Sequence, residues 1–148
     1  CLVNNRDPVA FCSSTFYRNT VNAEQLSEPE RLQQLKKFAL YWVDHSKTLK
    51  EHISASGFVT CSYEQFCESP QSLKNTFEKA TGEIIHPEKN PILNIKDYQP
   101  AVIKNKNQQQ VSRLSEVEIE SVVQTLRPYS TLTSFFGYAP EDWLQTAY

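Results

Sequence analysis

The chain has 148 residues, of which 39% are hydrophobic, and its formal net charge is −2. That length is enough for one domain with a core of its own. The sequence has no basic arm and no run in which cationic and aromatic residues alternate, which argues against a nucleic-acid surface. It shows no signal-peptide pattern and no apolar run long enough to cross a membrane.

Charge is unevenly distributed along the chain. Basic residues predominate between Pro87 and Arg113, whereas the segment from Leu114 onward is acidic. This pattern favours a small anionic ligand over a polyanion. Four cysteines, Cys1, Cys12, Cys61 and Cys67, lack the paired spacing of a zinc site. We therefore expect reduced thiols, as in the cytoplasm, and no metal.

The first predicted element is a buried strand that ends at an arginine. The apolar residues Cys1-Leu2-Val3 lead to Arg6, and a helix follows to about Tyr17. Asp7 is a typical N-cap and Pro8 suits the first helical position. The segment therefore predicts a strand-to-helix corner.

Such a corner has the composition of an anion site. A guanidinium from Arg6, the unpaired amides of the helix start and a hydroxyl from Ser13 or Ser14 can all face one phosphate. The same tripeptide also occurs in ordinary corners, so the motif needs further support from the rest of the chain.

A long helix and a second strand follow. Apolar residues recur at helical spacing from Pro29, and Gly57 ends the pattern. Residues Phe58–Tyr63 are rich in β-formers and predict a strand. A strand, a helix and a strand predict parallel pairing, with ligands bound at the carboxyl edge, where Arg6 and Tyr63 lie.

The next predicted helix runs from Pro70 to Gly82, and Glu83 to Ser112 then reads as a long loop. Its polar run, Asn105–Gln110, contains no apolar anchor. We therefore expect the loop from Pro100 to Ser112 to become ordered only when a ligand adds a charge contact.

The last third of the chain is predicted to be helical. Ser115 and Glu118 have the spacing of a capping box, and Pro128 stops the helix that they open. A short helix over Ser130–Phe136 and a turn that begins at Pro140 complete the chain.

Three motifs point to a family when they are read in order. They are Arg6-Asp7-Pro8 with a serine eight positions after the arginine, the strand end Ser62-Tyr63-Glu64 before a capped helix, and a late helix followed by Gly137-Tyr138. Together with Trp42 in the long helix, they resemble the carboxyl-terminal half of the sulfotransferases that use 3′-phosphoadenosine-5′-phosphosulfate (PAPS).

The resemblance implies a P-loop-like three-layer α/β fold with a parallel sheet and a helix-rich C-terminal half. It implies that PAPS is the donor and that 3′-phosphoadenosine-5′-phosphate (PAP) is the product. It also implies that Arg6 and Ser14 bind the 3′-phosphate, with Ser13 as the alternative hydroxyl, and that Tyr63 lies beside the adenine. The remaining nucleotide-binding candidates are the basic residues Lys104, Lys106 and Arg113.

The chain departs from the family in several ways. The loop that cradles the 5′-phosphosulfate and the catalytic base both precede the arginine that corresponds to Arg6, so the catalytic residues are unknown. The family's Arg-Lys-Gly triplet is missing. The chain has no methionine and opens in an apolar segment, so we expect a preceding segment that completes a single domain. His45, His52 and His86 have no nucleophile or metal-type spacing beside them and are interpreted as structural or surface residues.

Three functions remain open from the sequence. The first is transfer of a sulfuryl group to a hydroxyl or amine of a small-molecule or glycan acceptor. The second is a P-loop nucleotide or phosphate kinase relative. The third is a non-catalytic interaction domain with a sulfotransferase-like fold.

Overall fold

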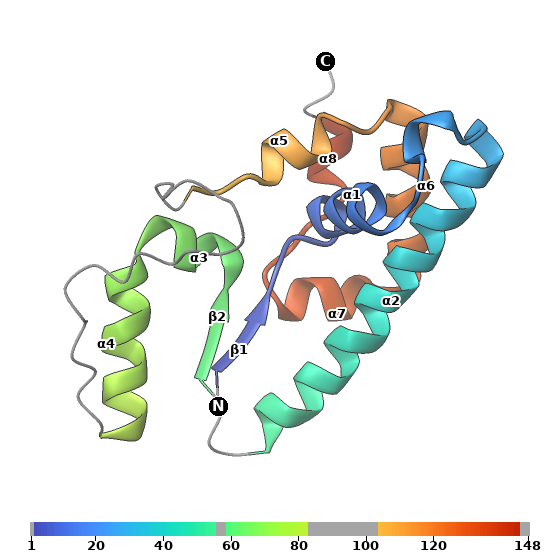
Figure 1. Cartoon of the computed structure of the whole chain (residues 1–148). Coiled ribbons are helices and arrows are strands. Elements are labelled where there is room, and N and C mark those ends of the chain that lie inside the picture. The colour runs from blue at the N-terminus through green and yellow to red at the C-terminus, as the bar shows by residue number, and fades with distance from the viewer. Residues whose placement is uncertain (1, 56–58, 83–103, 146–148) are drawn as a thin grey trace.

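The computed structural model describes residues 2–55, 59–82 and 104–145 (Figure 1). The first elements are β1 (Leu2–Asn5), α1 (Pro8–Asn19), η1 (Ala23–Gln25), α2 (Glu28–Ser54), β2 (Val59–Ser62), α3 (Tyr63–Glu68) and α4 (Pro70–Thr81). The later elements are α5 (Asn107–Val111), α6 (Glu116–Leu126), η2 (Arg127–Tyr129), α7 (Ser130–Phe135) and α8 (Asp142–Gln145).

The expected three-layer α/β fold is wrong. Within the described residues, β1 and β2 form a single parallel pair, with Leu2 opposite Val59 and Asn5 opposite Ser62. All the other regular elements there are helical. A P-loop-like fold needs a wider parallel sheet with helices on both faces. The described part of the chain has only two segments with a strand pattern, so its architecture is mainly helical.

The strand-to-helix corner is confirmed. Asp7 is the N-cap of α1, where its side chain accepts a hydrogen bond of 2.8 Å from the Ala10 N–H. Pro8 occupies the first helical position, where its missing N–H is not needed. The parallel pairing of the two predicted strands across α2 is also confirmed.

Tyr63 does not end the second strand as predicted but begins helix α3. Ser62 caps this helix, because its hydroxyl accepts from the Gln65 N–H at 3.0 Å while the Gln65 side chain accepts from the Ser62 N–H. Helix α4 then starts at Pro70, as predicted.

The prediction of one loop from Glu83 to Ser112 is partly wrong. Residues 83–103 lie outside the described part, but Asn107–Val111 form α5, which packs against α1. Val111 and Leu114 are buried, and the Ser13 hydroxyl donates a hydrogen bond of 2.6 Å to the Gln110 carbonyl. The buried side chains of Val111 and Leu114, at and just after the end of the polar run, therefore anchor α5 against α1.

The core lies where α1, α2 and α6 meet (Figure 1). Its largest fully buried side chains include Phe16, Leu35, Trp42 and Leu126. The Trp42 indole N–H donates to the Arg6 carbonyl at 2.9 Å, so the same side chain that fills the core also fixes the end of β1.

A buried ion pair connects α2 to α6. Glu118 is 3% exposed and accepts a hydrogen bond of 2.5 Å from Arg31 Nε. The other guanidinium nitrogens donate to the Ala23 carbonyl and the Tyr17 hydroxyl. Glu118 also accepts from the N–H of Ser115 in a capping box.

We expect Glu118→Ala to lower the free energy of unfolding by about 3 kcal/mol or more, because it leaves Arg31 without its carboxylate. Glu116→Ala, an exposed first-turn change in the same helix, is the control and should cost less than about 1 kcal/mol. Urea unfolding followed by circular dichroism measures both. Similar losses for the two variants would contradict a dominant role for the ion pair.

Candidate functional site

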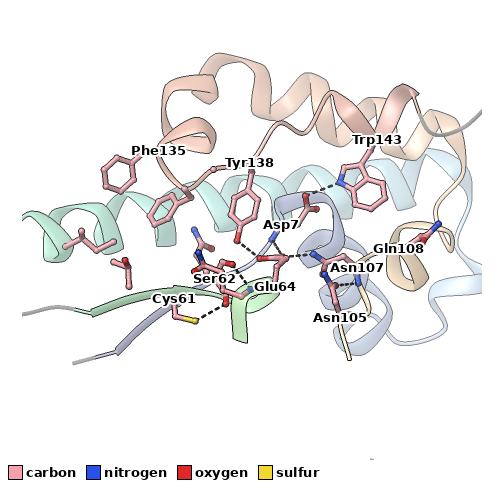
Figure 2. Close-up of a pocket in the computed structure, with 16 residues that line it drawn as sticks. Asp7, Cys61, Ser62, Glu64, Asn105, Asn107, Gln108, Phe135, Tyr138 and Trp143 are labelled. Atoms are coloured by element: carbon pink, nitrogen blue, oxygen red, sulfur yellow. Dashed lines mark hydrogen bonds between the residues drawn. The ribbon is translucent and has the colours of Figure 1, made fainter. Parts of the chain in front are cut away.

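The Glu64 carboxylate, at the start of α3, joins three distant parts of the chain (Figure 2). Its Oε1 accepts hydrogen bonds from the Asp7 N–H, at 3.1 Å, and from Asn107 Nδ2. Its Oε2 accepts from the Tyr138 hydroxyl at 3.0 Å. The corner after β1, the first residue of α5 and the segment after α7 therefore meet at one carboxylate.

Two carboxylates at this site have opposite pKa shifts. Burial raises the pKa of Glu64, but the hydrogen bonds that it accepts from Asp7, Asn107 and Tyr138 outweigh this effect, and its pKa lies below 4.5. Burial also raises the pKa of Asp7, and there the bonds from Ala10 and Trp143 do not fully compensate. Glu64 is thus ionised at neutral pH.

Arg6 lies next to this carboxylate cluster without joining it directly. Its Nε donates to Asn107 Oδ1 at 2.8 Å, and its guanidinium carbon lies 4.4 Å from the centroid of the Tyr63 ring. The Nη2 atom is shielded from solvent and has no hydrogen-bond partner among the described residues. The Asn107 amide links Arg6 to Glu64, because its Nδ2 donates to that carboxylate.

The two candidate serines differ in their surroundings. Ser13 is fully buried and its hydroxyl proton is used in the bond to the Gln110 carbonyl. Ser14 is half-buried on α1. Ser13 therefore serves the packing of α1 against α5, and Ser14 is the serine with some access to solvent.

The structure brings Tyr63 to Arg6 and the backbone of Lys104 to Tyr63. The Tyr63 hydroxyl donates to the Lys104 carbonyl at 3.2 Å, while its ring contacts Arg6. Lys104 and Lys106 are exposed, and Lys106 is the residue before α5. Burial raises the pKa of the Tyr63 phenol, so it remains a neutral donor.

Arg113 makes a separate contact. Its guanidinium carbon lies 3.6 Å from the centroid of the Tyr17 ring, and its carbonyl accepts from the Tyr17 hydroxyl at 2.7 Å. Among the described residues, no hydrogen bond, ion pair or ring contact joins Arg113 to Arg6. Its charge is therefore engaged by α1 rather than by the other candidates.

A cavity of about 820 Å³ borders the Glu64 cluster. Asp7, Glu64 and Asn107 line it, together with Tyr138 and Trp143 (Figure 2). The Trp143 indole N–H donates to Asp7 Oδ2 at 3.0 Å. No lysine, arginine or histidine lines the cavity within the described residues.

Sequence reasoning missed Glu64, Asn107 and Tyr138 as site residues. The sequence predicts a strand up to Tyr63 and no α3, so it assigns no role to Glu64, although Ser62 and Gln65 have the spacing of a capping box. Asn107 sits in a polar run with no local signal that its amide is buried. Tyr138 was read only as part of a motif.

No family model matches the chain, and neither the curated proteins nor the solved structures give a match. Among the described residues, no helix is long and apolar enough to cross a membrane.

We expect Glu64→Gln to lower the free energy of unfolding by about 1–3 kcal/mol at about pH 7, because hydrogen bonds to a carboxylate are lost. The pKa of Glu64 is lowered by folding, so its stabilisation is complete above pH 4.5 and is lost as the pH falls through the folded-state pKa. The wild type and variant should therefore converge in acid. Urea unfolding from about pH 7 to about pH 3.5 measures this.

Asp7, whose pKa is shifted the other way, is present in both proteins, so its contribution largely cancels in the difference. A stability difference that stays constant or grows as the pH falls would contradict the assignment to Glu64.

Proposed function

We propose that the chain belongs to an enzyme that transfers a sulfuryl group from PAPS to a hydroxyl or amine acceptor, and that Arg6 binds the 3′-phosphate of the nucleotide. The order of the three sequence motifs supports this proposal. The mainly helical architecture does not contribute to it, so the argument rests on the residues around Arg6.

The observation that carries the proposal is the unpaired Arg6 Nη2. An unsatisfied donor on a charged group is costly when shielded from water, and native structures rarely keep one without a reason. Nε is already bonded to Asn107, which fixes the guanidinium and leaves Nη2 for a second acceptor. A phosphate oxygen forms a charge-assisted bond of the kind that arginine suits.

Neighbouring groups strengthen this assignment. Lys104 and Lys106 are exposed on the segment that Tyr63 contacts through its hydroxyl. Ser14 lies on the helix whose N-cap follows Arg6 directly. A phosphate with two negative charges suits two cations and a hydroxyl in addition to the guanidinium, and Lys104, Lys106 and Ser14 are the candidates for these roles.

Sulfuryl transfer breaks the bond between sulfur and the oxygen that bridges it to the 5′-phosphate, and forms a bond from sulfur to the acceptor oxygen or nitrogen. The acceptor proton goes to a base, and PAP leaves. We assign no residue of this chain as that base. The role proposed for the chain is to hold the nucleotide.

The free thiols of Cys12, Cys61 and Cys67 agree with a cytoplasmic location.

We expect Arg6→Ala to weaken binding of PAP by roughly 10- to 100-fold, because a charge-assisted bond is lost. Binding of adenosine 5′-phosphate, which lacks the 3′-phosphate, should change little. Isothermal titration calorimetry measures both affinities. Arg18→Ala removes an exposed arginine from α1 and is the matched control for net charge.

Equal losses for the two nucleotides would overturn the assignment of Arg6 to the 3′-phosphate. Binding that depends on a nucleoside triphosphate instead would favour a kinase relative. Arg6→Lys, which keeps the charge without the planar guanidinium, should recover only part of the affinity for PAP.

The two serines provide a further test. Ser14→Ala should weaken PAP binding by about 1 kcal/mol and leave stability unchanged or slightly raised, because alanine favours helices. Ser13→Ala should instead lower the free energy of unfolding by about 1 kcal/mol, because the hydrogen bond from the buried Ser13 hydroxyl to the Gln110 carbonyl is lost. Calorimetry and urea unfolding distinguish the two effects. The reverse pattern would assign the phosphate contact to Ser13.

A further inference from the structure

The cavity beside Glu64 has two chemically different ends. Ile53, Phe135 and Phe136 contribute apolar side chains to the lining, and Gln65, Asn105 and Gln108 contribute amides. Figure 2 shows Phe135 at one end, Gln108 and Trp143 toward the other, and Glu64 with Tyr138 between them. A ligand that fills this cavity therefore meets an apolar surface and a polar one.

The amides at the polar end have hydrogen-bonding capacity to spare. The side-chain oxygens of Gln65 and Asn105 accept from backbone N–H groups, which leaves their NH₂ groups free of partners within the described residues. The Gln108 side chain is exposed on α5 and makes no hydrogen bond to another described residue. Amides donate and accept, as hydroxyl groups do, so this surface matches a molecule with several hydroxyls.

The charge of the described lining disfavours anions. Asp7 and Glu64 contribute carboxylates, and the described lining holds no cation. Arg6 and Lys50 contact lining residues, at Asn107 and at the Phe135 ring, but neither side chain lines the cavity. A ligand with its own carboxylate would therefore face the ionised Glu64 carboxylate with no cationic partner among the described lining residues.

We propose that this cavity binds an uncharged, hydroxyl-rich group that carries an apolar substituent, such as an aryl glycoside, and rejects its anionic counterpart. If the cavity holds the sulfuryl acceptor, this inference rests on the proposed function. Binding of such a ligand to the cavity does not require the nucleotide, so the cavity proposal and the proposed function can fail separately.

Three probes test the proposal by calorimetry on the whole protein without nucleotide. They are para-nitrophenyl β-glucoside, methyl β-glucoside, which lacks the aryl group, and para-nitrophenyl β-glucuronide, which differs from the first in bearing a carboxylate. We expect the aryl glucoside to bind roughly three- to tenfold more tightly than the methyl glucoside, because it reaches the aromatic end. The glucuronide should bind more weakly than the aryl glucoside by at least about tenfold.

Two pairs of variants locate the binding. Phe135→Ala and Gln108→Ala, one at each end of the cavity, should each weaken binding of the aryl glucoside by roughly three- to tenfold. Tyr41→Ala and Gln109→Ala are the controls, because both residues are exposed on α2 and α5 but do not line the cavity. The controls should leave the affinity unchanged. Phe135 and Gln108 are themselves exposed, so these changes should not unfold the protein.

The proposal is overturned if the aryl glucoside does not bind, if the glucuronide binds as well as the glucoside, or if the controls weaken binding as much as the cavity variants. If the protein binds PAP but no glucoside, the proposed function stands and the cavity proposal is wrong. A protein that binds the glucoside but not PAP would retain the cavity as a binding site and lose its role as an acceptor site.

Discussion

One carboxylate organises the region around the candidate site. Glu64 accepts hydrogen bonds from the backbone of Asp7, the amide of Asn107 and the hydroxyl of Tyr138. These donors are separated from Glu64 by 57, 43 and 74 positions in the chain, so the carboxylate holds together parts that local structure alone would leave independent. Such donors stabilise a partly buried negative charge. The positions of α3, α5 and the segment after α7 are therefore interdependent.

The same arrangement separates two chemistries. On one side of Asn107 lies Arg6, with a guanidinium nitrogen that has no partner among the described residues. On the other side lies the cavity, with the carboxylates of Asp7 and Glu64 in its wall. An anion is attracted to the first side and repelled by the second. The site and the cavity can thus receive different ligands although a single residue borders both.

Local signals in the sequence were sufficient for part of this structure. Asp7 and Pro8 predict the start of α1, and Ser115 with Glu118 predicts the start of α6, because helix capping depends on residues within one turn. The fold class was not predictable in this way, since it depends on how many strands pair, and the described chain pairs only two. The role of Asn107 was also not predictable from local signals. Its burial depends on Arg6 and Glu64, which lie far away in the sequence.

The amide of Asn107 explains how Arg6 keeps its charge available. Its Oδ1 accepts a hydrogen bond from Arg6 while its Nδ2 donates one to Glu64. The bridge between Arg6 and Glu64 therefore requires both the acceptor and the donor of one amide group. An aspartate at this position would face Glu64 with a like charge, and a leucine would leave a donor and an acceptor unpaired. A direct Arg6–Glu64 ion pair would instead neutralise the guanidinium. With the amide between them, Arg6 is held by a dipole and its positive charge remains for an added anion.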